Sequence, residues 1–178
     1  KNLPSSGNGG AIVTDDEELY EYALSYRNNG KFYHNEMSGT NSRMSEQECA
    51  QLLIRTKYLD QWQWRRKEIR HYYLDEFKNL PFDCLSRDYM VHADQKFVIY
   101  TDQRNDLKQS LQSKGIESRV HYEQALSELP IAKNLVRPDL LATSVMLTRG
   151  VLSLPIYPEL SDSEVETVAQ AVKSFFTC

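Results

Sequence analysis

A long stretch of helical periodicity in the middle of the chain is the feature that most constrains its fold. Ser45 and Glu48 have the spacing of an N-terminal capping box. From there, residues suited to one buried face recur at steps of three and four as far as about Lys78. These positions are Cys49, Leu52, Leu53, Thr56, Leu59, Trp62, Ile69, Tyr73 and Phe77. The pattern predicts one long helix over 45–78, whose first three positions pack in a core.

Charged and aromatic residues also lie in this predicted helix. The basic run 65–67, Arg-Arg-Lys, is followed by Glu68 and by the acidic pair 75–76. Charges of both signs on one helix indicate a solvated face and not a nucleic-acid patch. Trp62 and Trp64 are candidates for a core or an interface.

The segment before this helix begins with a lysine and a glycine turn. Lys1 precedes residues 7–10, Gly-Asn-Gly-Gly, which let the backbone pass close to other groups. Residues 11–14, Ala-Ile-Val-Thr, predict a short strand. The acidic run 15–18 predicts the capped start of a helix. This helix ends at residues 28–30, Asn-Asn-Gly. The acidic run is interpreted as capping and not as a catalytic carboxylate pair.

Residues 31–44 are polar and irregular, and a loop of this length is more often functional than idle. Within it, His34 is interpreted as an exposed loop residue. Asn41 and Arg43 lie just before a helix start, where an amide and a guanidinium can bind an anion.

After the long helix the pattern changes to shorter units, beginning near 79–81, Asn-Leu-Pro. A second capping box, Ser161 with Glu164, opens the last of them. The predicted elements are strands at 96–101, 116–122 and 151–154, a helix at 104–114 ended by Gly115, and a final helix through Phe176. Together they predict a small α/β domain in which helices cover a short sheet.

Composition excludes several classes of protein. The 178 residues are 40% hydrophobic and 26% charged, enough to bury a core, and the net charge is only −4. This mild charge argues against nucleic acid as a partner. No run approaches the roughly eighteen apolar residues of a membrane span, and no basic-then-apolar leader opens the chain. Cys49, Cys84 and Cys178 are isolated, which argues against a disulfide framework or a metal site and fits the cytoplasm.

Several segments, in order along nearly the whole chain, resemble the DegT/StrS-type sugar aminotransferases. These are pyridoxal-phosphate enzymes of the aspartate aminotransferase fold, and they aminate keto groups on nucleotide-linked sugars. The segments that carry the resemblance are 1–3, 7–19, 27–30, 41–48, 96–99, 114–116, 120–122 and 152–165. The resemblance implies an α/β fold.

The resemblance also implies roles for individual residues. Lys1 matches the lysine that binds pyridoxal 5'-phosphate covalently, so it is the implied catalytic and cofactor-binding residue. Asn41 matches an asparagine that reaches across a dimer to the cofactor phosphate of the other subunit. Arg43, His121 and Tyr122 are the implied substrate-binding residues.

By the same resemblance, the chain is the C-terminal half of such an enzyme. Residues 1–44 are then the end of the large cofactor-binding domain, residues 45–78 the long connecting helix, and residues 79–178 the small C-terminal domain. The parts that precede the lysine in relatives, including most phosphate ligands, lie outside the chain.

The predicted activity is the transfer of an amino group from L-glutamate to a keto-deoxy sugar linked to a nucleotide. A dTDP- or UDP-4-keto-6-deoxyhexose is favoured over a 3-keto sugar. The resemblance further implies a cytoplasmic homodimer with shared active sites and no membrane partner. It places the product in surface polysaccharide, O-antigen or glycosylated natural products.

Two alternatives stay open. Enzymes of this fold that carry out dehydration or deoxygenation have histidine in place of the lysine, so Lys1 argues against them. The other alternative is a non-catalytic or regulatory remnant of the family that acts through protein–protein interaction.

After Tyr122 the chain departs from many relatives, with Glu-Gln-Ala-Leu-Ser-Glu-Leu-Pro at 123–130 in place of prolines and a histidine. This departure puts the sugar's identity in doubt, but not the cofactor chemistry.

Overall fold

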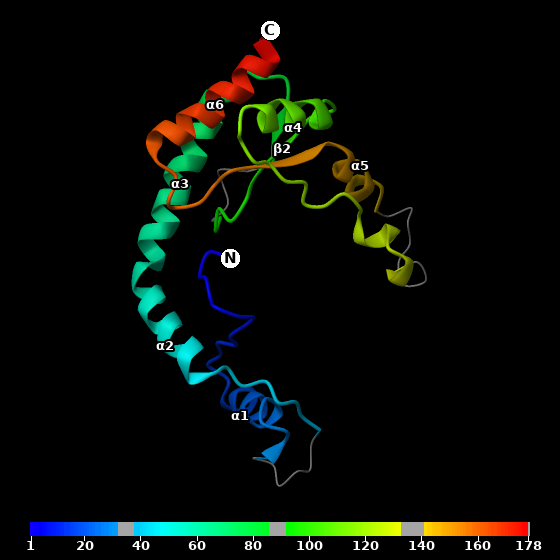
Figure 1. Ribbon diagram of the computed structural model, residues 1–178. Coiled ribbons are helices and arrows are strands. Elements are labelled where there is room, and N and C mark those ends of the chain that lie inside the picture. Colours follow the sequence, from blue (N-terminus) through cyan, green and yellow to red (C-terminus); the bar gives the residue numbers. More distant parts are fainter. Residues whose placement is uncertain (32–37, 86–91, 133–140, 178) are drawn as a thin grey trace. The chain divides into compact units, whose positions relative to one another are not determined.

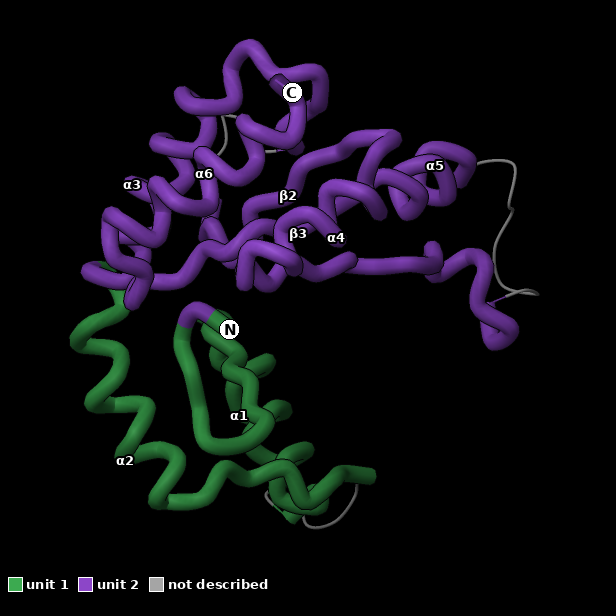
Figure 2. Tube along the Cα trace, turned by 45° about the horizontal axis from the view of Figure 1, so that its top comes forward, with its two compact units in different colours: residues 1, 3–60 green, residues 2, 61–178 purple. Residues whose placement is uncertain are grey.

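The computed structural model describes residues 1–31, 38–85, 92–132 and 141–177 (Figure 1). They form a mixed α/β protein with a small sheet, which confirms the predicted fold class. The chain divides into two compact units (Figure 2). Unit 1 is residues 1 and 3–60, and unit 2 is residues 2 and 61–178. His34 lies outside the described residues.

Unit 1 begins its regular structure with helix α1, Glu17–Tyr26. The Oδ1 atom of Asp16 accepts a hydrogen bond from the backbone N–H of Leu19 at 3.0 Å, as an N-cap should. After the helix, Asn29 and Gly30 adopt positive φ angles of 60° and 76°, which turn the chain away from the helix axis. The predicted start and end of this helix are confirmed.

The predicted strand at 11–14 is wrong. These residues have no regular structure, and the side chains of Ile12 and Val13 are 71% and 95% exposed. A β-branched sequence favours an extended backbone, but a strand forms only where a neighbour accepts its hydrogen bonds. No described segment of the chain pairs with these residues.

Helix α2, Glu46–Arg55, starts with the predicted capping box. The backbone N–H of Glu48 donates to Ser45 Oγ, and the backbone N–H of Ser45 donates to Glu48 Oε2, both at 3.3 Å. The single helix predicted over 45–78 is instead interrupted by a 3-10 turn, η2, Thr56–Tyr58. The predicted core at its start is also wrong, since no residue of α2 is buried and Leu53 is 70% exposed.

The sheet of unit 2 has three antiparallel strands in the order β1-β2-β3. They are β1, Asp83–Cys84; β2, Phe97–Tyr100; and β3, Val151–Leu154. In the register of the longer pair, Phe97 lies opposite Leu154 and Tyr100 opposite Val151. The start of β2 and the end of β3 therefore share one end of the sheet.

The helices of unit 2 are α3, Leu59–Glu76, whose first two residues belong to unit 1; α4, Arg104–Ser113; α5, Ala142–Gly150; and α6, Asp162–Thr177. Short 3-10 turns occur at η3, Leu126–Glu128, and η4, Pro130–Ala132. The predicted strands near 96–101 and 151–154, the helix near 104–114 and the final helix are confirmed. The sequence did not predict β1 or α5.

The strand predicted at 116–122 is wrong. Only Arg119 forms a bridge there, to Ser153 on β3. Residues 116–122 otherwise run as irregular chain beside the sheet, and an isolated bridge is too short to make a strand.

Every buried hydrophobic residue that the structure describes lies in unit 2. The core joins the inner sides of α3, α4 and α6 to the sheet, and all four residues of β3 are buried. The most deeply buried large side chains are Ile69, Tyr73, Phe97, Ile99, Leu107, Leu111, Leu152 and Val172. This core gives the grooves described below a rigid support.

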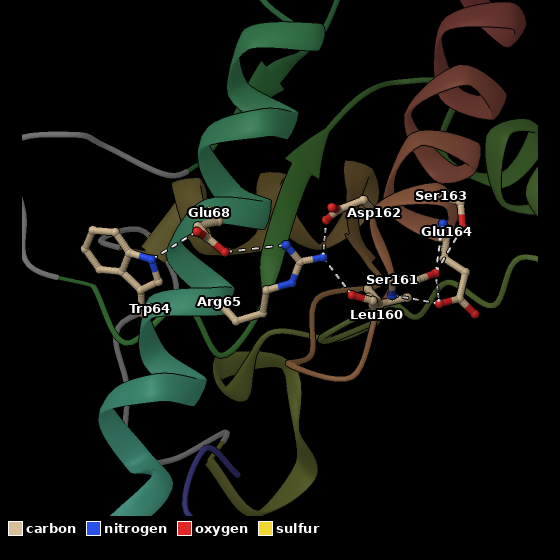
Figure 3. A network of polar contacts seen from close by, with 8 residues as sticks. All are labelled: Trp64, Arg65, Glu68, Leu160, Ser161, Asp162, Ser163 and Glu164. Carbon is tan, nitrogen blue, oxygen red and sulfur yellow. Dashed lines mark hydrogen bonds and ion pairs between the residues drawn. The ribbon is translucent and has the colours of Figure 1, made fainter.

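Helices α3 and α6 are joined by polar contacts that start at Arg65 (Figure 3). The Arg65 Nη2 atom donates to the carbonyl of Leu160 and to Asp162 Oδ1, each at 2.7 Å, and its Nη1 lies 3.4 Å from Glu68. Trp64 is 62% exposed and donates from Nε1 to Glu68 at 3.0 Å.

The solvated face predicted for residues 65–67 is wrong at Arg66. Its side chain is only 9% exposed and binds backbone carbonyls of other segments. Mixed charge along the sequence does not reveal that one of these cations points into the protein. The prediction failed because the partners of Arg66 are remote in sequence.

Candidate active site

The candidate site residues of unit 1 start with Lys1, whose side chain is exposed in a segment without regular structure. Helix α2 holds the residues that follow it. Arg55 Nη1 donates to the carbonyl of Pro4 at 2.9 Å, and the Ser6 hydroxyl donates to the Gln51 side chain. The lysine is thus attached to a chain segment that α2 fixes at two points.

Asn41 lies in a short segment that backbone hydrogen bonds fix to the end of α1. The N–H of Thr40 donates to the carbonyl of Tyr26 at 2.7 Å, and the N–H of Ser42 donates to Arg27 at 2.9 Å. In return, the N–H of Asn29 donates to Thr40 at 3.1 Å. Asn41 itself forms a bridge with Asn28. This segment is therefore a defined platform for its side chains.

The side chains of Asn41 and Arg43 are both exposed on this platform. Within the described residues, neither the Asn41 amide nor the Arg43 guanidinium makes a side-chain hydrogen bond. Together with the amine of Lys1, unit 1 thus offers a nucleophile and two kinds of N–H donor. These groups fit pyridoxal phosphate, whose aldehyde suits an amine and whose phosphate suits N–H donors.

His121 and Tyr122 lie in unit 2, beside β3. Arg119 and Ser153 exchange two backbone hydrogen bonds of 3.1 and 2.8 Å, which fix the chain just before His121. The His121 Nδ1 atom lies 2.9 Å from Ser153 Oγ, so the hydroxyl orients the imidazole. The ring of Tyr122 meets the imidazole edge-on at 5.6 Å between centroids and is 67% exposed.

Two grooves in unit 2 meet at His121. The large groove, of about 1380 Å³, is lined by residues 92–96, residues 121–127 and one side of α5. The small groove, of about 520 Å³, is lined by residues 114–117, residues 153–157 and the first turns of α6. The volume of the small groove is typical of small-molecule sites, which span roughly 300–1,000 Å³.

The sequence did not point to Lys96, which lines both grooves with Gln95 and His121. Its Nζ atom donates to Gln95 Oε1 at 2.8 Å. A lysine at the start of a predicted strand gives no signal by itself, because only the folded chain places it beside His121. Lys114 and Arg119 add cationic groups to the small groove, which suits an anionic ligand.

Carboxylates offset part of this positive charge. Glu117 pairs with Arg119 at 2.7 Å, and both side chains are largely exposed. Glu164 also lines the small groove, where hydrogen bonds from the Ser161 hydroxyl and backbone lower the pKa of its carboxyl. Among the described residues, no cluster of three or more His, Cys, Asp and Glu side chains could hold a metal.

The model of the DegT/DnrJ/EryC1/StrS aminotransferase family matches residues 1–173. The chain belongs to this aminotransferase family. The predicted family is thus confirmed, and with it pyridoxal phosphate as the family's cofactor. None of the described helices has the length and apolar character that crossing a membrane requires.

Curated relatives include two sugar transaminases. The dTDP-3-amino-3,4,6-trideoxy-alpha-D-glucose transaminase of Streptomyces venezuelae is 35% identical over 98% of this chain and 48% of its own length. The dTDP-3-amino-3,6-dideoxy-alpha-D-galactopyranose transaminase of Aneurinibacillus thermoaerophilus is 37% identical over 94% of this chain and 47% of its own. The chain spans about half the length of the curated relatives it matches.

A solved relative has the same fold. The crystal structure of S. venezuelae DesV in complex with a ketimine intermediate matches all of this chain and 49% of its own, with a TM-score of 0.92 and 32% identity.

Proposed function

We propose that this chain supplies the cofactor lysine and part of the substrate site of a pyridoxal-phosphate-dependent nucleotide-sugar aminotransferase. The observation that carries the proposal is the family match, which begins at Lys1 and extends through both units. The exposed amine of Lys1, on a segment held by α2, supports it. The complete activity requires the rest of a full-length enzyme, because relatives are about twice as long.

In this proposal Lys1 has two tasks. Its Nζ would hold the cofactor at the aldehyde carbon, with the aldehyde oxygen leaving as water, and the same nitrogen would carry the proton that moves during amino transfer. The cofactor, when bound, supplies the electron sink for this chemistry. Asn41 donates its amide N–H to the cofactor phosphate of a partner subunit, so the active form is a homodimer.

The proposed substrates are L-glutamate and a nucleotide-linked keto-deoxy sugar. The ketone becomes an amine while glutamate becomes 2-oxoglutarate, so the reaction balances without an oxidant. Arg43, His121 and Tyr122 bind the sugar nucleotide. Both curated transaminases described above are named for 3-amino sugars, so a 3-keto sugar is to be assayed beside the 4-keto-6-deoxyhexose.

The test uses the protein expressed from its full natural coding sequence. The protein is incubated with pyridoxal phosphate, reduced with borohydride, digested and analysed by mass spectrometry. The reduced cofactor is expected on the Lys1 peptide, and a Lys1→Ala variant is expected to lose both the label and the transfer of nitrogen from glutamate. Lys57→Gln changes an exposed lysine on η2 and serves as the control.

The opposite result has a clear meaning. Cofactor on another lysine, or an unlabelled Lys1 at excess cofactor, overturns the catalytic assignment and favours the regulatory alternative. A labelled Lys1 with no turnover of either keto sugar instead overturns only the substrate class.

A further inference from the structure

Helix α3 carries two buried arginines, one helical turn apart on the same face. Arg66 is 9% exposed and Arg70 is 4% exposed. Removing a guanidinium from water is costly unless carboxylate or carbonyl oxygens replace the water. Burial accordingly lowers the pKa of Arg66, and nearby Glu159 and Asp94 counteract part of that effect. The position of these two cations must therefore be maintained by specific partners.

The first partner is Asp94, which is itself only 9% exposed. Arg70 Nε lies 3.2 Å from Asp94 Oδ1, and Arg66 Nη1 donates to the Asp94 backbone carbonyl at 3.4 Å. The two arginines thus hold both the side chain and the main chain of one residue. Asp94 has a φ angle of 45°, in the left-handed region that non-glycine residues rarely adopt. The contacts stabilise this turn just before β2.

The second partner is the segment that leaves β3. Arg66 Nη1 donates to the carbonyl of Ile156 at 2.6 Å, and the hydroxyl of Tyr73 donates to the carbonyl of Pro155 at 3.0 Å. Because Phe97 lies opposite Leu154, the segment that enters β2 and the segment that leaves β3 lie at the same end of the sheet. One face of α3 therefore fixes the chain on both sides of that end.

These fixed segments are walls of the two grooves. Residues 92–96 line the large groove, and Gln95, Lys96, Pro155 and Ile156 line the small groove. Lys96, two residues after Asp94, lines both grooves.

We propose that Arg66 and Arg70 are positioning residues, which act through Asp94 to place Lys96 where it binds the diphosphate of the nucleotide-linked substrate. This inference rests on the proposed function, from which it takes the substrate class. An ammonium group is a suitable partner for a diphosphate, and its position matters because charge attraction falls with distance. The arginines do not touch the ligand.

The test is a double-mutant cycle in the full-length protein, with dTDP and UDP as probes in titration calorimetry. Lys96→Gln removes the charge at the groove, and Asp94→Asn removes the ion pair behind it. Each is expected to raise the dissociation constant about tenfold, a change well within the range of lost charge-assisted contacts. The double variant is expected to bind the nucleotides no more weakly than either single variant, because both substitutions abolish the same interaction.

Glu76→Gln is the matched control. It breaks the 2.7 Å ion pair between Glu76 on α3 and Lys173 on α6, and neither residue lines a groove. Hydrogen exchange adds a readout that needs no ligand. The peptide over 92–98 is expected to gain deuterium faster in Asp94→Asn and to stay unchanged in Glu76→Gln. In steady-state assays Asp94→Asn is expected to raise the KM for the nucleotide sugar more than it lowers kcat.

Four results overturn the inference. If Lys96→Gln binds the nucleotides as tightly as the parent, Lys96 does not bind the diphosphate. If the losses of affinity in the double variant are additive, Asp94 does not act through Lys96. If hydrogen exchange over 92–98 is unchanged in Asp94→Asn, the ion pair does not fix this segment, whatever ligand the protein binds. If neither nucleotide binds the parent protein while Lys1 accepts the cofactor, the substrate class fails and this inference fails with it, but the cofactor chemistry stands.

Discussion

At Gly39 two backbone segments of unit 1 come close together. A Cβ atom at this position would lie 2.5 Å from the backbone nitrogen of Gly30 and 2.6 Å from the carbonyl oxygen of Tyr26. Backbone atoms cannot move aside as a flexible side chain can. The close approach therefore depends on the missing side chain, and it holds the platform that carries Asn41.

Gly39→Ala is expected to displace this platform. The overlap should cost roughly 1–3 kcal/mol of stability in unit 1, as other overpacking substitutions do. The amide NMR signals of residues 38–44 should shift, and cofactor binding should weaken because Asn41 moves. Gly10→Ala is the matched control, since a Cβ there meets no atom within 4 Å. Unshifted signals in Gly39→Ala would show that the segment can adapt without moving Asn41.

At the scale of single elements, the start of α6 shows how a local motif sets a charge. The backbone N–H of Ser161 donates to Glu164 Oε2 at 2.8 Å, and its hydroxyl donates to the same atom at 2.6 Å. Both bonds favour the ionised carboxylate and lower the pKa of Glu164. The contribution of this cap is present above the pKa of Glu164 in the unfolded chain, and it is lost as the pH falls through the lower folded value.

Ser161→Ala is expected to raise the pKa of Glu164 toward its ordinary value, which NMR titration of the carboxyl carbon measures. The variant should be less stable than the parent at pH 7, and this difference should shrink under acid conditions where the carboxyl is protonated. Ser113→Ala is the control, because its hydroxyl donates to the carbonyl of Ser110 in its own helix and contacts no carboxylate among the described residues. A stability difference that stays constant down to acid pH would contradict the role of the carboxylate.

At the scale of the whole molecule, the buried hydrophobic side chains among the described residues are confined to unit 2. Unit 1 instead exposes large apolar side chains, such as Leu53 on α2 and Tyr20 on α1. Resistance to global unfolding in unit 2 should therefore come from packing, since burial of apolar surface is the main favourable term. Both tryptophans of the chain, Trp62 and Trp64, belong to this unit and can report on its unfolding.

Leu152→Ala is expected to destabilise unit 2 by about 2–5 kcal/mol, because it leaves a cavity at a fully buried position of β3. Urea unfolding followed by tryptophan fluorescence measures the loss. Leu126→Ala removes a side chain that is 78% exposed, and it should change stability by less than about 0.5 kcal/mol. Equal effects of the two substitutions would place the stabilising core elsewhere.

The sequence by itself determined the features whose cause lies within about one helical turn. The caps at Asp16, Ser45 and Ser161 and the helix end at Gly115 follow from side chains and backbone angles that are neighbours in the chain. The strands at 97–100 and 151–154 were also predictable, because each is a short run of apolar, strand-forming residues with turn-forming residues nearby in the sequence. The family could also be identified from the sequence, because the segments that resemble it follow one another in order along nearly the whole chain.

Only the tertiary structure decided what depends on remote partners. Residues 11–14 and 116–122 have strand-like sequences. Among the described segments, however, none pairs with 11–14, and 116–122 make only the single bridge at Arg119. The packing expected at Leu53 also has no described partner. Arg66 is buried because Ile156, which lies 90 residues further along the chain, supplies a carbonyl. A hydrogen bond or a packed contact needs its second partner in place, and local sequence does not encode where a distant segment will lie.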